Sequence, residues 1–99
     1  MNTEVRVEKS RRTVTIAIVG RFDFSCHQAF RRSYENAEDA EEYVVDLGAT
    51  DYMDSSALGM LLLLREHAEP KSRVRIANCR PAVRRILEIA NFHTLFAVS

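Results

Sequence analysis

Short runs rich in valine and isoleucine alternate in this chain with segments of helical periodicity, and this alternation limits the possible folds more than any other feature. A polar turn separates the first two runs, which is typical of neighbouring antiparallel strands. Strands are predicted at 5–7, 13–19, 43–47, 73–77 and 95–98, and helices at 26–35, 55–67 and 81–90. The order β-β-α-β-α-β-α-β implies right-handed crossovers, and hence an α/β fold with a mixed, mostly parallel sheet.

The length and composition fit one small globular domain over residues 1–99. Hydrophobic residues make up 46% and charged residues 28%, so disorder is not expected. The longest apolar run, 60–64, is too short to cross a bilayer, and the first residues do not resemble a signal peptide. The chain has two cysteines, Cys26 and Cys79, and neither is part of a CxxC pair. A secreted chain that needs disulfides would carry more cysteines at denser spacing, so both are interpreted as small, partly buried thiols in a reducing cytosol. We expect a cytoplasmic monomer that does not bind membranes.

The formal net charge is zero, which argues against direct binding of nucleic acid. The charges are nevertheless unevenly distributed. Residues 1–32 sum to +4, residues 33–69 to −9 and residues 70–99 to +5. If the acids of the middle segment gather in space, they form a negative field that a further charge would strengthen.

Several residues are typical of turns and helix ends. Gly20 is expected to end the second strand, and Asp23 or Ser25 to cap the helix that follows. Residues 51–54 are predicted to be a loop. Pro81 suits the first position of the last helix, and Asn91 can end that helix in the left-handed conformation.

Patterns that bind cofactors or metals, or that catalyse hydrolysis, are absent from the sequence. Its three glycines do not form a phosphate-binding loop, and the histidines at 27, 67 and 93 have no ligand spacing, so neither a cofactor nor a metal is expected. Cys26 and His27 are adjacent on a helix and would not face each other. A hydrolase using Ser55 or Cys26 is therefore disfavoured, and no catalytic residue is assigned. The basic set Arg80, Arg84 and Arg85 is interpreted as a solvated helix face, with a partner contact as the alternative.

The segment 54–64 is unusual because its helix is apolar on nearly all sides. Such a helix is either buried or covered by a partner. Gly59 within it costs about 1 kcal/mol relative to alanine, which suggests close packing or a contact at that position. Asp54 is a candidate N-cap that leaves the Ser55 hydroxyl facing water.

A phosphate on Ser55 would be tolerated at the helix start, but it would add about −1.5 to −2 charges beside Asp54 and Asp51. It would therefore act on an interface rather than on the fold. The alternative is that the Asp-Ser-Ser cluster only caps the helix.

Residues Asp54-Ser55-Ser56-Ala57-Leu58-Gly59 resemble the phosphorylation motif of bacterial anti-sigma factor antagonists, the STAS domain family. Three further segments are similar to the family pattern over nearly the whole chain: 20–23, 43–47, and 78–87 followed by Phe92. The resemblance implies a non-enzymatic switch protein that binds an anti-sigma factor, often itself a serine kinase, when Ser55 is unphosphorylated, and thereby frees a sigma factor.

The resemblance also implies that the partner kinase phosphorylates Ser55, with Ser56 as second choice, and that a PP2C-type phosphatase restores it. The expected partner-binding residues are Asp23, Asp54, Ser55, Ser56, Ala57, Gly59 and Met60. Ala57 stands where the motif commonly has glycine, and its methyl is expected to change how closely a partner approaches. No segment follows that matches the terminal helix of many relatives, so that region is expected to be open or filled by a partner. The alternative function is an unphosphorylated STAS-type subunit of a transporter or signalling complex.

Overall fold

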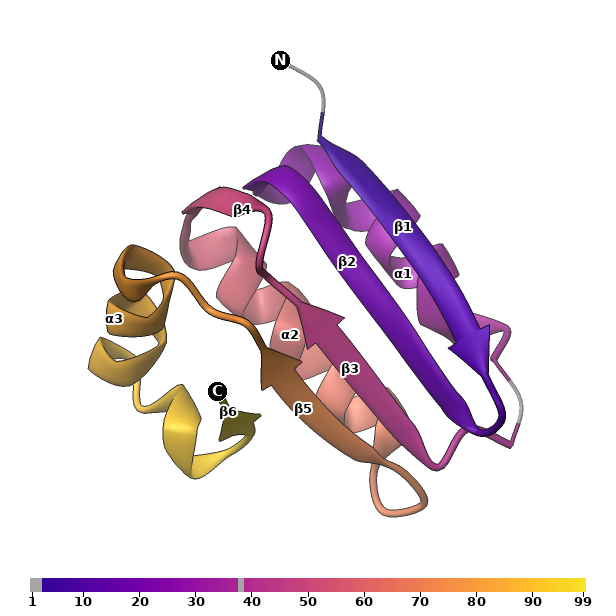
Figure 1. Cartoon of the computed structure of the whole chain (residues 1–99). Coiled ribbons are helices and arrows are strands. Elements are labelled where there is room, and N and C mark those ends of the chain that lie inside the picture. Colours follow the sequence, from indigo (N-terminus) through magenta and orange to yellow (C-terminus); the bar gives the residue numbers. More distant parts are fainter. Residues whose placement is uncertain (1–2, 38) are drawn as a thin grey trace.

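A computed structural model describes residues 3–37 and 39–99 (Figure 1). In chain order the elements are β1 (Glu4–Ser10), β2 (Thr13–Phe22), α1 (His27–Glu35), β3 (Glu42–Asp46), β4 (Thr50–Met53), α2 (Ser55–Ala68), β5 (Arg73–Ala77), α3 (Pro81–Ile89) and β6 (Ala97–Val98). Two short 3₁₀ turns, η1 (Phe24–Cys26) and η2 (Phe92–Thr94), precede α1 and β6.

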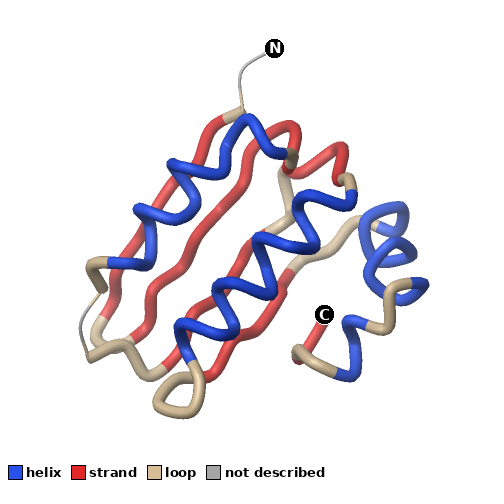
Figure 2. The backbone as a smooth tube through the Cα atoms, turned by 180° about the vertical axis from the view of Figure 1, so that it is seen from behind, coloured by secondary structure: helices blue, strands red, loops and turns tan. Residues whose placement is uncertain are grey.

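The strands form one mixed sheet in the order β1-β2-β3-β5-β6, and β4 also pairs with β2. β1 and β2 are antiparallel, and the other strand pairs are parallel, so the predicted α/β class is confirmed. Helices α1 and α2 lie side by side across one face of the sheet (Figure 2). α3 lies beyond the end of β5, at one corner of the molecule (Figure 1). None of the described helices covers the opposite face of the sheet.

The core lies between the sheet and the two helices. Alternate residues of β2, Val14, Ile16 and Ile18, point into it, as the period of two predicts. They meet buried residues of the neighbouring strands and of α2, among them Val45, Ile76, Leu61 and Leu64. The α2 helix is thus anchored against the centre of the sheet, which fixes the position of its first residue.

The predicted loop at 51–54 is wrong, because residues 50–53 form β4. Thr50 is fully buried, and its Oγ1 donates to the Ile18 carbonyl at 2.7 Å, while the Gly20 N–H donates to the Ala49 carbonyl at 2.9 Å. These bonds join segments about 30 residues apart, so the local sequence pattern did not indicate them. The observed order is therefore β-β-α-β-β-α-β-α-β.

Strand boundaries also differ from the prediction. β1 covers Glu4–Ser10 rather than residues 5–7, because pairing with β2 continues to the Ser10–Thr13 pair. β2 continues through Gly20 to Phe22, because Gly20 adopts a φ of 96° at a register shift in the pairing with β4 rather than ending the strand. The last strand is shorter than predicted and contains only Ala97 and Val98. Leu95 belongs instead to the turn after η2, where its N–H donates to the Phe92 carbonyl.

Three of the predicted helix-end residues are confirmed. Asp54 caps α2, Pro81 is the first residue of α3, and Asn91 has the left-handed φ of 62° two residues after α3 ends. The expectation that Asp23 or Ser25 caps the first helix is wrong, because the N-cap of α1 is Cys26 and makes no side-chain hydrogen bond. Asp23 instead caps the 3₁₀ turn η1 before α1, where its side chain accepts from the Ser25 N–H. In the described part of the chain, none of the helices has the length and apolar character that crossing a bilayer requires.

Candidate partner-binding site

Two aspartates follow neighbouring strand ends at one end of the sheet. Phe22 and Met53, the last residues of β2 and β4, are paired in a parallel ladder, so Asp23 and Asp54 leave the sheet in the same direction. Both carboxylates influence the buried Cys26 thiol, which lies close enough to each that their charge helps to raise its pKa. The structure therefore brings together two predicted site residues that are 31 positions apart.

Asp54 and Ser56 form a closed capping arrangement at the start of α2. The Asp54 Oδ1 accepts from the backbone N–H groups of Ser56 at 3.0 Å and Ala57 at 3.3 Å, and from the Ser56 hydroxyl at 2.5 Å. Ser55 is exposed, and within the described residues its hydroxyl has no hydrogen-bond partner. The geometry thus separates the two serines: the Ser56 hydroxyl is engaged in the cap, and the Ser55 hydroxyl is available to a partner.

Asp23 repeats this arrangement one strand away. Its Oδ1 accepts from the Ser25 N–H at 3.0 Å and from the Ser25 hydroxyl at 2.5 Å. Its Oδ2 accepts from the Arg21 Nε at 3.2 Å, and the Arg21 guanidinium lies 3.9 Å from the centre of the Tyr52 ring. The Ser25 hydrogen bonds, helped by Arg21, lower the pKa of Asp23, so it is a carboxylate near neutral pH.

The outward side of α2 carries a strip that is open to a partner. Ser55, Gly59 and Leu62 follow the i, i+4, i+7 spacing, and Leu63 extends the strip (Leu62 and Leu63 are 41% and 58% exposed). A Cβ built on Gly59 would meet no atom within 4 Å. The expected close packing of Gly59 within the chain is therefore not found, and the absent side chain leaves backbone open to contact from outside.

Ala57 and Met60 lie on the inward side of the same helix. Ala57 is fully buried and Met60 is 7% exposed, so both side chains pack in the core. The expectation that the Ala57 methyl would alter a partner's approach is corrected, because that methyl faces the sheet. Of the predicted partner-binding residues, Asp23, Asp54, Ser55, Ser56 and Gly59 reach this end of the surface, and Ala57 and Met60 do not.

Sequence reasoning missed other exposed side chains near this end of the sheet. Phe24 is 63% exposed and stacks on the His27 ring with the centroids 4.0 Å apart. Tyr52 is 40% exposed and lies under Arg21. An aromatic residue beside a capping aspartate was a usable signal for Phe24, whereas Tyr52 became recognisable only once β4 had been placed beside β2.

The acids of the middle segment do not gather around Ser55. Asp51 and Asp54 lie near it, but Glu41 and Glu42 lie at the other end of the sheet, where Glu42 pairs with Thr13. There Glu41 contacts Arg12 at 3.1 Å, and Glu42 contacts Arg75 at 3.8 Å. The expectation of one negative field from the whole segment is therefore corrected, because the sheet divides these acids between its two ends.

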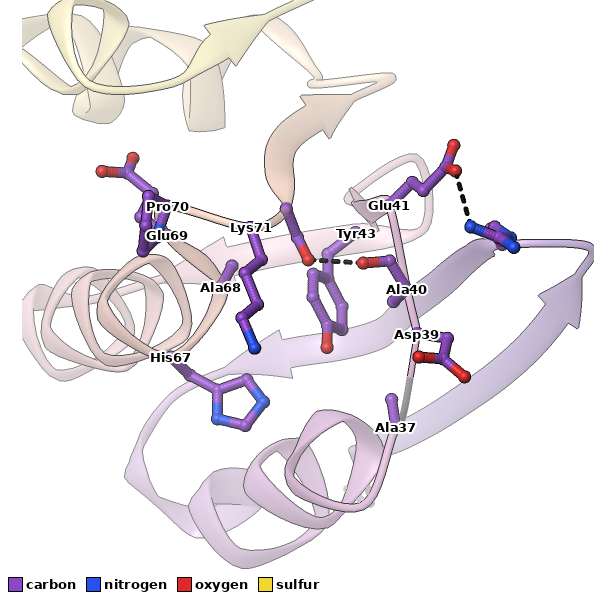
Figure 3. Close-up of a pocket in the computed structure, with 12 residues that line it drawn as sticks. Ala37, Asp39, Ala40, Glu41, Tyr43, His67, Ala68, Glu69, Pro70 and Lys71 are labelled. Carbon is purple, nitrogen blue, oxygen red and sulfur yellow. Dashed lines mark hydrogen bonds and ion pairs between the residues drawn. The ribbon is translucent and has the colours of Figure 1, made fainter.

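A cavity of about 670 Å³ opens at this far end, between the carboxyl ends of α1 and α2 (Figure 3). Tyr43, His67 and Lys71 line it, together with the carboxylates of Asp39 and Glu41. The strand β2, ten residues or about 30 Å long, separates this cavity from Ser55. The cavity is therefore not part of the candidate partner-binding site.

Cys26 has the properties of a core residue and not those of a nucleophile. It is buried, and its Sγ donates to the Asp23 carbonyl at 3.2 Å. Burial, with help from the negative charges of Asp23 and Asp54, raises the pKa of the thiol. A thiol with a raised pKa carries little thiolate at neutral pH, which argues against the hydrolase hypothesis for this residue.

Comparisons with known proteins agree on the family. The family model described as Mlab, STAS domain, matches residues 5–97. A STAS-domain containing protein of Pseudomonas aeruginosa (strain UCBPP-PA14) is 56% identical over 88 residues, which are 87% of each chain.

Two solved structures share the fold at low identity. An anti-sigma factor antagonist from Mycobacterium paratuberculosis has a TM-score of 0.85 and 20% identity, with 98% of this chain and 85% of that chain covered. The phosphorylated form of the Bacillus cell fate determinant SpoIIAA has a TM-score of 0.71 and 20% identity, with 97% and 91% covered. Since the family model matches nearly the whole length and the fold is that of anti-sigma factor antagonists, the chain belongs to the STAS domain family.

Proposed function

We propose that this protein is a phosphorylation-switched anti-sigma factor antagonist that acts in the cytoplasm. In its unphosphorylated form it binds an anti-sigma factor through the Ser55 end of α2 and releases a sigma factor. A serine kinase, which can be the anti-sigma factor itself, phosphorylates Ser55, and a PP2C-type phosphatase removes the phosphate. The protein is a binding module and performs no chemistry of its own. The observation that carries the proposal is the exposed Ser55 hydroxyl, which has no hydrogen-bond partner among the described residues and lies at the start of the strip that contains Leu62 and Leu63.

The proposed switch follows from adding negative charge between a capping carboxylate and the exposed apolar residues of α2. The Ser56 and Ala57 N–H groups already donate to the Asp54 carboxylate, so a phosphate on Ser55 would add its negative charge beside one that is present. A partner that covers Leu62 and Leu63 would have to desolvate that phosphate or move away from it. Phosphorylation therefore lowers partner affinity while the helix remains folded.

Phosphorylation is tested by incubating the purified protein with ATP and an extract of the cells that produce it. Intact mass and peptide mapping are expected to place one phosphate on Ser55. The Ser55→Ala variant should remain unmodified, while Ser56→Ala should still be modified, since Ser56 serves the cap. Modification that persists in Ser55→Ala and is lost in Ser56→Ala would reverse the assignment.

Binding is tested with the partner that mass spectrometry identifies on immobilised Ser55→Ala protein. The same partner, once purified, should bind the wild type and Ser55→Ala equally, and Ser55→Asp at least about tenfold more weakly, which corresponds to 1.4 kcal/mol. Equal binding of Ser55→Asp would favour the alternative, an unphosphorylated STAS-type subunit of a transporter or signalling complex.

Gly59→Ala separates the binding role of Gly59 from a role in the fold. The position is an exposed helix interior with open space around the missing Cβ, so alanine should stabilise the protein by up to about 1 kcal/mol in urea unfolding. If the partner approaches the backbone at Gly59, the same variant should bind it more weakly. A variant that is more stable and binds normally would exclude Gly59 from the interface.

A further inference from the structure

The described sheet has two outer edges of very different length. β6 contributes two residues at one edge, and β1 contributes seven, Glu4–Ser10, at the other. No described element lies beyond β1 in the plane of the sheet (Figure 1). A long unpaired edge is a template for another strand unless charge or irregularity prevents pairing. The charges along β1 therefore decide what this edge can accept.

The hydrogen-bonding direction of each β1 residue follows from its neighbours. Backbone groups at even positions along β2 point toward β3 and β4. The Arg12 carbonyl, just before β2, accepts from the Glu41 N–H, and the Gly20 N–H donates to the Ala49 carbonyl. The odd positions of β2 therefore bond toward β1, where they pair with Glu4, Arg6, Glu8 and Ser10. The backbone groups of Val5, Val7 and Lys9 consequently point outward, away from the sheet. They supply three donors and three acceptors to a strand that pairs with this edge.

The side chains of β1 are self-complementary in one antiparallel register. When Val7 lies opposite Val7 of a second copy, the outward backbone groups of both strands match, and Val5 lies opposite Lys9. Arg6 then lies opposite Glu8 at a non-hydrogen-bonded pair, where side chains are closest, and the two-fold axis repeats this contact. Val7 is 44% exposed, so the central pair also buries apolar surface.

The other registers are less favourable. A shift that places Arg6 opposite Arg6 also places Glu4 opposite Glu8, and a shift in the other direction places Glu8 opposite Glu8. Like charges directly opposite each other oppose pairing. A register centred on Val5 pairs Glu4 with Arg6 but leaves Glu8, Lys9 and Ser10 unpaired. Of these registers, only the one centred on Val7 pairs the whole strand, places Arg6 opposite Glu8 twice and brings no like charges opposite each other.

We propose that two copies of this chain associate through β1, antiparallel and centred on Val7, so that their sheets join into one continuous sheet. This dimer replaces the monomer expected from the sequence. The dimer does not cover the Ser55 end of α2. β1 packs against α1, whereas α2 packs against β5, which is separated from β1 by β2 and β3. The inference does not depend on the proposed function, since it uses only the edge strand and its charges.

The register predicts the result of reversing charges. In sedimentation-equilibrium measurements over a range of protein concentrations, the wild type should dimerise, and Arg6→Glu or Glu8→Arg should weaken the dimer about tenfold or more. The double variant Arg6→Glu/Glu8→Arg should recover it, because each pair is again of opposite charge. Arg85→Glu, an exposed change of equal charge on α3, should leave dimerisation unchanged. Wild-type protein that stays monomeric at all concentrations, or a double variant that does not recover, would overturn the proposal.

Cross-linking tests the register by an independent measurement. With a short bis-maleimide, Val7→Cys should form a covalent dimer, since residue 7 lies opposite itself. Val5→Cys should not exceed the background of the wild type, whose Cys79 is partly accessible, because residue 5 lies opposite residue 9. Circular dichroism establishes that each variant is folded. Cross-linking of Val5→Cys in place of Val7→Cys would contradict the register.

Discussion

At the scale of single residues, the candidate partner-binding site contains two aspartates, Asp23 and Asp54, which also act as N-caps. Asp23 and Asp54 each accept from a backbone N–H and from a serine hydroxyl two positions later. The Asp54 cap holds the first turn of α2, and the Asp23 cap holds the 3₁₀ turn η1 that precedes α1. These bonds engage the hydroxyls of Ser25 and Ser56, whereas the Ser55 hydroxyl has no hydrogen-bond partner in the part of the chain that the structure describes. The proposed selectivity of phosphorylation between the adjacent serines rests on which hydroxyl bonds to the capping carboxylate.

Removing the α2 cap should reduce stability without altering the core. Asp54→Ala loses the acceptor for the Ser56 and Ala57 N–H groups and should lower the free energy of unfolding by about 1 kcal/mol in urea titrations. Asp54→Asn keeps an oxygen acceptor and should stay near the wild type. Asp51→Ala, an exposed neighbour, is the control for loss of charge. Equal losses in Asp54→Ala and Asp51→Ala would show that the cap contributes nothing.

Asp23 should make stability depend on pH in the acid range. Its folded pKa is lowered, chiefly by the Ser25 hydrogen bonds, so the unfolded chain binds the proton more tightly. The stabilisation is therefore complete above the unfolded pKa, about 3.9, and is lost as the pH falls through the lower folded value. The stability difference between the wild type and Ser25→Ala, measured by urea unfolding, should narrow from pH 7 to pH 3. A gap of the same size at both pH values would refute this.

At the scale of elements, β4 brings the capped start of α2 next to the end of β2, so that residues of both form one surface. It is short, but it places Tyr52 under Arg21 and Asp54 beside Asp23. At this pairing the buried Thr50 hydroxyl donates to the Ile18 carbonyl, and the register shifts between Gly20 and Arg21. α2 then continues from β4 with one side in the core and the other carrying Gly59, Leu62 and Leu63.

The buried Thr50 hydroxyl should be a measurable support of β4. Thr50→Val keeps the shape but leaves the Ile18 carbonyl without this donor, so the free energy of unfolding should fall by about 1–2 kcal/mol. Thr50→Ser keeps the hydroxyl and serves as the matched variant. Hydrogen exchange at the Gly20 N–H, which bonds to Ala49, should accelerate in Thr50→Val more than in Thr50→Ser. Unchanged exchange would show that β4 is held by other contacts.

At the scale of the whole molecule, the centre of the sheet is well packed, whereas α3 and β6 have fewer contacts with the rest of the described chain. β2 and β3 carry fully buried residues such as Ile16 and Val45, and α1 and α2 cover them. α3 packs mainly on β4 and η2, and β6 is a two-residue edge strand. The two ends of the sheet also differ, since Ser55 lies at one end and the charged cavity at the other.

This arrangement predicts a gradient of local stability. Native-state hydrogen exchange measured by NMR should show Ile16 and Val45 amides exchanging only through global unfolding. The amides of α3 should exchange through openings of lower free energy, because few buried contacts hold that helix to the sheet. Exchange of α3 and β2 with the same opening free energy would indicate a single cooperative unit.

The sequence by itself determined the local structure. Alternation in β2 and β5, helical spacing in α1 and α3, and the residues Asp54, Pro81 and Asn91 determine most elements and their ends through short-range sterics and hydrogen bonds. The motif at 54–59 is likewise a local feature, because its residues are consecutive in the chain and its cap spans only two to three positions.

Only the tertiary structure decided which of these residues reach one surface. β4 is a strand through its parallel pairing with β2, about 30 positions away in the chain, and no local pattern encodes those contacts. Ala57 and Met60 face the core while Gly59 and Leu62 face out, because the sheet covers only one side of a helix that is apolar nearly all around. The acids of residues 33–69 were divided between the two ends for a similar reason: the direction in which each strand runs places its charges, and that direction is set by pairing.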